Sequence, residues 1–193
     1  EEEKTEPEKH VTVANLFDAL GELTAAELRR KAVDTIASSP AAFDPVSVVV
    51  PALSLLSQWH GERVNADASF LQLWQHAAEF LLARSEHPPE PPRDWRQSVT
   101  LSCRCEDCRE LQSFTRNPAE HAHRFRVRKD RRQHLHETIK QHSLDMTHVT
   151  ERKGSPQTLV CAKTRGAYQR RCAQYRADLA SMTVLFPLLR TGG

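Results

Sequence analysis

Three cysteines within six residues constrain this chain more than any other sequence feature. Cys103, Cys105 and Cys108 form the pattern C-x-C-x2-C. Thiolates this close repel one another unless a cation compensates their charge, and a divalent metal ion is the usual solution. The chain has five cysteines, an odd number, and no secretory features, so metal binding in a reducing compartment is favoured over disulfides. The cluster therefore predicts a structural zinc site.

Zinc in a structural site takes four ligands, so the three cysteines lack one. The candidates further along the chain are His121, His123, His134, His136, His148 and Cys161. We favour His134, because a helix would hold its imidazole in a fixed direction and the neighbouring Arg131 and Arg132 would offset the thiolate charge. Cys161 and Cys172 lie in apolar patterns and are expected to be small core residues.

A proline-rich stretch, HPPEPPRDW at residues 87–95, predicts a division of the chain. Four prolines in nine residues exclude a helix interior and favour a stiff, extended connector. The expected parts are a disordered acidic leader (1–10), a helical domain (11–86), the connector (87–95) and a zinc-binding α+β domain (96–190). Because the chain begins without Met and ends in TGG, we expect it to be a fragment of a larger protein.

The first half has the apolar periodicity of helices. The predicted helical segments are 11–37, 48–59 and 69–84. Gly21 is expected to break the first of them, and Thr24 with Glu27 forms a capping-box pattern that would start a new helix. Helices of this length with short connections indicate a bundle or an array of helical hairpins.

The second half has mixed patterns. Predicted helices cover 107–114, 131–142 and 167–185, and β-prone runs cover 97–101, 123–127, 146–152 and 157–163. The turn residues 153–156 (Lys-Gly-Ser-Pro) join the last two runs into a hairpin. The expected fold class is mainly α with a small α+β part: helices packed on a zinc-stabilised domain that contains a β-hairpin.

Charge is distributed unevenly along the chain. Residues 1–118 hold 12 Lys and Arg against 19 Asp and Glu, whereas residues 119–176 hold 14 against 5. The densest basic run consists of Arg124, Arg126, Arg128, Lys129, Arg131 and Arg132. In an alternating strand the first three would share one face, while Phe125 and Val127 would face the core. This density suits a nucleic-acid backbone, but a solvated face or pairing with the acidic half explains it equally well.

Four segments carry a resemblance to a known group of proteins: LLARSEHPPEPPRDW, SCRCEDCRELQSF, RKDRRQHLHETI and HVTERKGSPQTLVCAKT. They resemble the C-terminal regions of large, mostly fungal proteins whose N-terminal part is similar to 2-oxoglutarate and Fe(II)-dependent oxygenases of the prolyl-hydroxylase type. The resemblance covers about the second half of the chain. It implies an accessory domain, with any oxygenase active site upstream of these residues, and it transfers no catalytic residue to this chain.

These patterns favour a non-catalytic, zinc-stabilised module that recognises a protein partner or regulates an attached domain. The alternative is a domain that binds DNA or RNA through the basic run. A thiol enzyme centred on the cysteines is a third hypothesis, but a fully ligated zinc ion has no open position.

The chain has no Walker loop, dinucleotide fingerprint or H-E-x-x-H motif. It also has no apolar run long enough for a membrane span. An intracellular location, nuclear or cytoplasmic, is expected.

Overall fold

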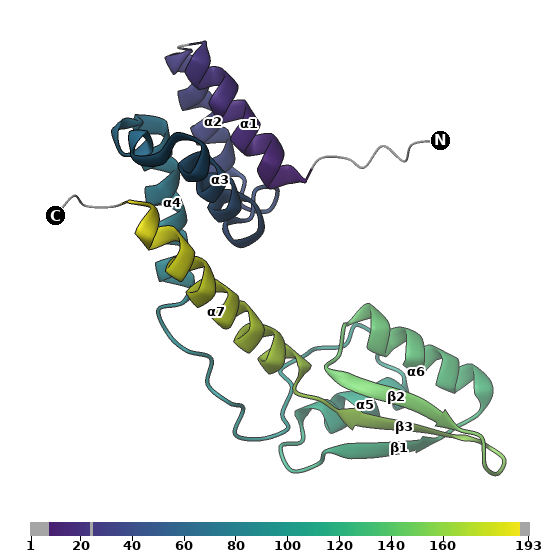
Figure 1. Ribbon diagram of the computed structural model, residues 1–193. Coiled ribbons are helices and arrows are strands. Elements are labelled where there is room, and N and C mark those ends of the chain that lie inside the picture. Colours follow the sequence, from purple (N-terminus) through teal and green to yellow (C-terminus); the bar gives the residue numbers. More distant parts are fainter. Residues whose placement is uncertain (1–7, 24, 190–193) are drawn as a thin grey trace. The chain divides into compact units, whose positions relative to one another are not determined.

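The computed structural model describes residues 8–23 and 25–189, which form two compact units (Figure 1). The helical unit contains the described residues up to Pro88 and those from Ala173 onward. The α+β unit spans Pro89–Cys172. The chain is mainly helical with one small antiparallel sheet, which confirms the predicted fold class at this level.

The described residues of the helical unit form four successive helices and, after the α+β unit, part of a fifth. They are α1 (Lys9–Glu22), α2 (Ala26–Ser38), α3 (Val50–His60), α4 (Ala68–Arg84) and the later part of α7 (Gly166–Leu185). A π-helical turn at Pro45–Val49 leads into α3, and 3-10 turns occupy Gly61–Ala66 and Phe186–Leu188.

Apolar stripes of these helices meet in one core. Its members include Phe17, Ile36, Val49, Leu53, Phe70, Leu73, Leu81 and Leu185. A carboxylate caps the start of α4. The Asp67 side chain accepts hydrogen bonds from the N–H groups of Ser69 (2.9 Å) and Phe70 (3.2 Å) at the start of α4.

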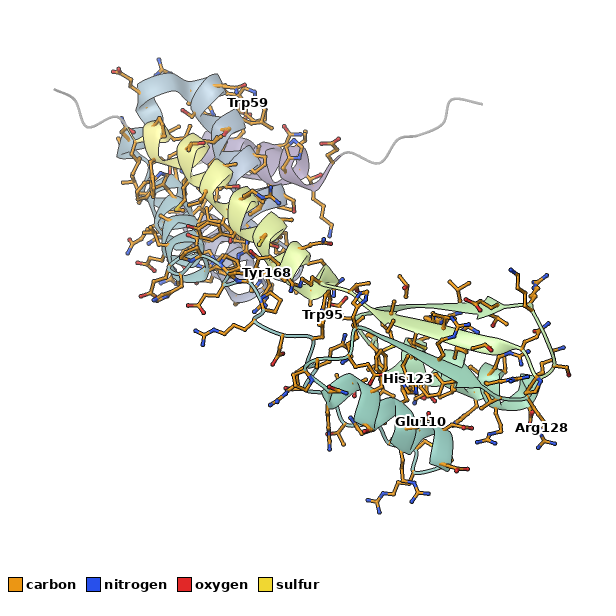
Figure 2. The ribbon with its side chains drawn as sticks, turned by 90° about the horizontal axis from the view of Figure 1, so that it is seen from below. Trp59, Trp95, Glu110, His123, Arg128 and Tyr168 are labelled. Atoms are coloured by element: carbon orange, nitrogen blue, oxygen red, sulfur yellow. The ribbon has the colours of Figure 1, made fainter. Side chains whose placement is uncertain are left out.

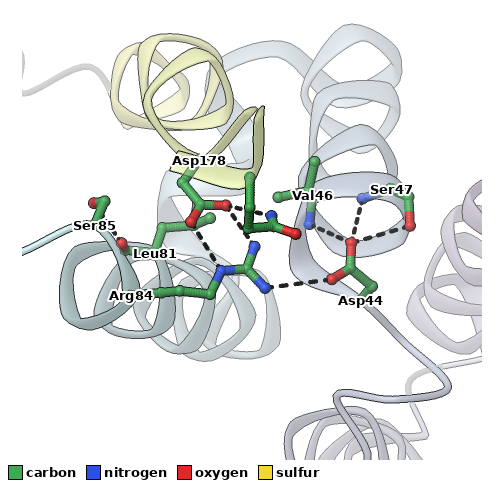
Figure 3. Close-up of polar contacts among 8 residues, drawn as sticks. Asp44, Val46, Ser47, Leu81, Arg84, Ser85 and Asp178 are labelled. Carbon is green, nitrogen blue, oxygen red and sulfur yellow. Dashed lines mark hydrogen bonds and ion pairs between the residues drawn. The ribbon is translucent and has the colours of Figure 1, made fainter. Parts of the chain in front are cut away.

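A buried ion pair joins α4 to α7 inside the helical unit (Figure 3). The Asp178 side chain is fully buried and accepts from Arg84 through Nε (2.8 Å) and Nη2 (2.5 Å). A second carboxylate, Asp44, lies 3.7 Å from Arg84 Nη1. The two parallel hydrogen bonds match the planar shape of the guanidinium group. This ion pair therefore fixes the position of α7 along α4.

The α+β unit contains two further helices and three strands. They are α5 (Glu106–Arg116), β1 (Ala122–Arg126), α6 (Lys129–Gln141), β2 (Met146–Glu151) and β3 (Thr158–Lys163), followed by the start of α7. The sheet is antiparallel, with the strand order β1-β3-β2 (Figure 1). β3 is the central strand, β2 pairs with one of its edges to form a hairpin, and β1 pairs with the other edge.

One face of this sheet forms the second core. Phe125 and Leu159 are register partners on that face. Side chains of α5 and α6 pack against them, including Leu111, Phe114, Leu135 and Ile139. Alternate residues of the strands point away from the helices, and Val149 is 64% exposed there.

One expected strand is not formed. Residues 97–101 run alongside α5 instead of joining the sheet, because side-chain and helix groups take their backbone hydrogen bonds. Gln112 Nε2 donates to the Val99 carbonyl (2.6 Å), and Leu101 N–H donates to Gln112 Oε1 (2.7 Å). The segment therefore has no need of a neighbouring strand.

The predicted boundaries of the leader and of the 96–190 domain also differ from those in the structure. Lys9 and His10, expected in the leader, begin α1, while Thr24 of the capping-box pattern lies outside the described residues. The sequence assigned all of the last helix to the 96–190 domain. In the structure Met182 and Leu185 of α7 belong to the core of the helical unit.

The described residues include no helix that is both long and apolar enough to cross a membrane.

Candidate metal centre

The three cysteines lie at the start of α5. Cys103 is in the loop before the helix, Cys105 is its N-cap residue, and Cys108 is in its first turn. Cys105 Sγ accepts a hydrogen bond from the Cys108 N–H (3.4 Å). Helix N-termini present unpaired N–H groups and a partial positive charge, both of which stabilise thiolates. The C-x-C-x2-C spacing thus wraps three sulfur atoms around one helix end.

His134, in the second turn of α6, completes the group. Its Nε2 atom lies 3.2 Å from Cys108 Sγ, and the four ligand atoms of Cys103, Cys105, Cys108 and His134 all lie within 4.8 Å of one another. Tetrahedral zinc, with bonds of about 2.3 Å to sulfur and about 2.0 Å to nitrogen, separates its ligand atoms by about 3.6–3.8 Å. The arrangement can therefore hold a tetrahedral metal ion with small side-chain adjustments.

An ion pair beside the cluster ties the two ligand-bearing helices together. Asp107 is buried, and Arg131 donates to both of its carboxylate oxygens, with 2.5 Å between Arg131 Nε and Asp107 Oδ2. Asp107 is next to Cys108 in α5, and Arg131 precedes His134 in α6. The pair therefore fixes the distance between the imidazole and the thiols.

The thiols of Cys103 and Cys108 have different electrostatic environments. The backbone N–H of Cys105, followed by the His134 side chain, lowers the pKa of the Cys103 thiol to about 7. Burial raises the pKa of the Cys108 thiol to about 12. A buried thiol keeps its proton unless a cation replaces it, so a metal ion bound at this site would displace the proton of Cys108.

The other candidates for the fourth ligand are engaged elsewhere. His121 packs against Trp95 with the two rings tilted, and their centroids are 4.3 Å apart. His136 and His148 contact each other, with their Nδ1 atoms 2.5 Å apart. Cys161 is fully buried in the core, which raises the pKa of its thiol to about 12.

His123 is held by two carboxylates rather than by the cysteines. Its Nδ1 lies 2.6 Å from Glu120 Oε1 and its Nε2 lies 2.9 Å from Glu110 Oε1 (Figure 2). Burial alone would lower the pKa of His123, but the two carboxylates outweigh it, so this pKa lies above its ordinary value.

The residues of the basic run have different contacts and therefore different roles. Arg132 is buried and donates to the Val127 carbonyl (2.7 Å) and to Gln157 Oε1 (2.9 Å), so it joins α6 to the hairpin loop. Arg131 is bound to Asp107, and Arg124 pairs with Glu151. Exposed members of the run are Arg124, Arg126, Arg128 and Lys129. The buried structural role of Arg132 was missed because Gln157, in the hairpin loop, is 25 residues away in the sequence.

Comparisons with protein-family models, with curated proteins and with solved structures find no match for this chain.

Proposed function

We propose that the α+β unit is a non-catalytic module stabilised by one zinc ion, and that Cys103, Cys105, Cys108 and His134 are its ligands. The observation that carries the proposal is the convergence of these four ligand atoms to within 4.8 Å. Three cysteine sulfurs and one imidazole that converge on one point suit zinc better than the hard cations, which prefer oxygen ligands.

The ligand set also supports a structural role for the metal. Catalytic zinc sites keep one position open for water or substrate, whereas four protein ligands leave none. Zinc would join the start of α5 to α6, the two helices that cover the sheet. The module would then recognise a protein partner or regulate an attached domain, which agrees with the accessory position implied by the resemblance to oxygenase-associated regions.

The direct test is the metal content and coordination of the purified chain. We expect about one zinc per chain, and the cobalt-substituted protein should show the visible spectrum of a tetrahedral ion with thiolate ligands. Cys108→Ser should lose stoichiometric metal, while the matched variant Ser113→Ala on the exposed side of α5 should keep it. Protein without stoichiometric metal, or a five- or six-coordinate cobalt spectrum, would reject the proposal.

A second candidate function, binding of DNA or RNA, is favoured by one observation. Arg126 and Glu151 are both register partners of Thr158, so the ends of β1 and β2 lie at the same end of the sheet. The exposed cations that follow these ends are Arg128, Lys129, Arg152 and Lys153. We propose that this basic end, with Arg126, would contact phosphates without base specificity.

Fluorescence anisotropy with labelled single-stranded RNA and duplex DNA tests the second candidate. We expect affinity that falls steeply between 50 and 200 mM salt, as for proteins that contact several phosphates. The double variant Arg126→Glu/Arg128→Glu should abolish binding, whereas Lys31→Glu/Arg63→Glu in the helical unit should not. Equal losses in both variants, or no binding at low salt, would exclude this function.

A further inference from the structure

The α+β unit contains a cavity that the metal centre does not use. Its volume is about 320 Å³, and it is lined by residues from three stretches of the unit: 92–99, 143–145 and 164–171. None of the four proposed zinc ligands lines it. The volume lies within the range for small-molecule sites, at its lower end.

Hydrogen bonds hold the walls of this cavity in place. Trp95 N–H donates to the Pro118 carbonyl (3.0 Å), and Gln97 N–H donates to the Thr115 carbonyl (2.8 Å). On the opposite wall, Asp145 accepts from the N–H groups of Gly166 (3.1 Å) and Ala167 (2.9 Å) at the start of α7. Gln97 Nε2 donates to the Asp145 carbonyl (2.6 Å) and so joins the two walls. A cavity fixed in this way loses little entropy on binding.

The charge of the lining favours an anion. Four guanidinium groups (Arg96, Arg165, Arg170 and Arg171) face two carboxylates (Asp94 and Asp145), a balance of four positive against two negative charges. Both carboxylates already accept backbone N–H groups, Asp94 from Arg96 and Asp145 from the start of α7. Within the described part of the chain, Arg96 and Arg171 make no ion pair.

Two aromatic rings complete the lining. Trp95, in the stretch 92–99, and Tyr168, in the first turn of α7, both line the cavity, and Figure 2 labels both residues. The guanidinium of Arg165 lies over the Trp95 ring, 4.8 Å from its centroid. Arginine bound to a ring keeps its N–H donors available for a phosphate. Because Arg165 and His121 already pack against Trp95, the ring of Tyr168 is the aromatic surface that suits a planar group.

We infer that this cavity binds a nucleotide, with the phosphate on the arginines and the planar base against Tyr168. The combination of guanidinium groups and rings in a cavity of this size fits a mononucleotide better than a bare anion, which needs no rings, or a nucleoside, which needs no arginines. The inference is independent of the zinc proposal, because the two sites share no side chain.

Isothermal titration calorimetry of the full, metal-loaded chain tests the inference with three probes. AMP carries the phosphate and the ring, ribose 5-phosphate lacks the ring, and adenosine lacks the phosphate. We expect AMP to bind one per chain and at least tenfold more tightly than either of the other two probes. Other nucleoside monophosphates, tested in the same way, would define the base preference.

Variants locate the site. Arg96→Ala/Arg171→Ala changes two exposed residues and should weaken AMP binding at least tenfold, while Lys31→Ala/Arg63→Ala, with the same change of charge at exposed sites of the helical unit, should change it less than twofold. Circular dichroism and the melting temperature verify that both variants fold. The inference is overturned if AMP shows no saturable binding, if ribose 5-phosphate or adenosine binds as well as AMP, or if the two double variants behave alike.

Discussion

At the scale of single residues, the role of His134 is the sharpest prediction. His134→Ala should lower zinc affinity by more than about 100-fold, because changing a group that merely supports a ligand already costs about 10–100-fold. His134→Cys should restore much of the affinity, since zinc accepts four thiolates. Competition with a chromophoric chelator measures both effects.

The matched control is Gln133→Ala, the exposed neighbour of His134 on α6. It leaves all four ligands in place and should bind zinc like the parent protein. If His134→Ala also retained the parent affinity, the fourth ligand would have to be another group.

His123 provides a prediction about pH. Its folded-state pKa lies above the ordinary value of about 6.5, so its ion pairs with Glu110 and Glu120 stabilise the fold fully below about pH 6.5. This contribution is lost as pH rises through the raised folded-state pKa. His123→Gln should therefore reduce stability more at pH 6 than at pH 8.5.

Urea denaturation at saturating zinc, at both pH values, measures this difference. His87→Gln serves as the control, because His87 is highly exposed. A loss of stability in His123→Gln that is the same at both pH values would mean that the imidazole acts through packing and not through its charge.

At the scale of secondary-structure elements, the start of α7 depends on a distant residue. Asp145 lies before β2 but caps α7 through the N–H groups of Gly166 and Ala167. Asp145→Ala should cost about 0.5–2 kcal/mol, the usual range for loss of a helix cap, measured by urea denaturation at neutral pH.

The same residue predicts a response to acid. Burial alone would raise the pKa of Asp145, but the hydrogen bonds from Thr164, Ala167 and Gly166 hold it below its ordinary value. The stabilisation by its charge is thus present above about pH 4 and is lost as pH falls further. The difference between the parent and Asp145→Ala should shrink in acid, whereas Asp130→Ala, at an exposed site on α6, should show little difference at either pH.

At the scale of the whole molecule, the two separate hydrophobic cores predict that the two units can unfold independently of each other. The core of the helical unit draws on α1–α4 and α7, and that of the α+β unit on α5, α6 and the sheet. Zinc removal should unfold only the second, because metal binding would supply folding free energy to that unit alone.

Limited proteolysis followed by mass spectrometry can check this prediction. After chelation, cleavage sites should appear within 89–172, while the described part of the helical unit before Pro88 stays protected. Readdition of zinc should restore protection. Simultaneous cleavage of both units would show that they unfold as one cooperative body.

Local sequence patterns were sufficient to predict most elements of this fold. Helical periodicity predicted α3 to α7 to within a few residues, and the turn residues between 153 and 156 predicted the β2-β3 hairpin. These features depend on neighbours a few residues apart, which the sequence displays directly. The same holds for the three cysteines, whose spacing alone brings their sulfur atoms to one helix end.

Tertiary structure decided what depends on contacts between distant residues. In the folded chain His134 lies beside the cysteines, whereas His136 contacts His148. Arg132 lies in the interior and not on a basic surface. Residues 97–101 lie against Gln112 of α5, and residues from three separate stretches line one cavity. Periodicity shows which face of a helix is apolar, but the partner of each polar side chain follows only from the packing of helices and strands against one another.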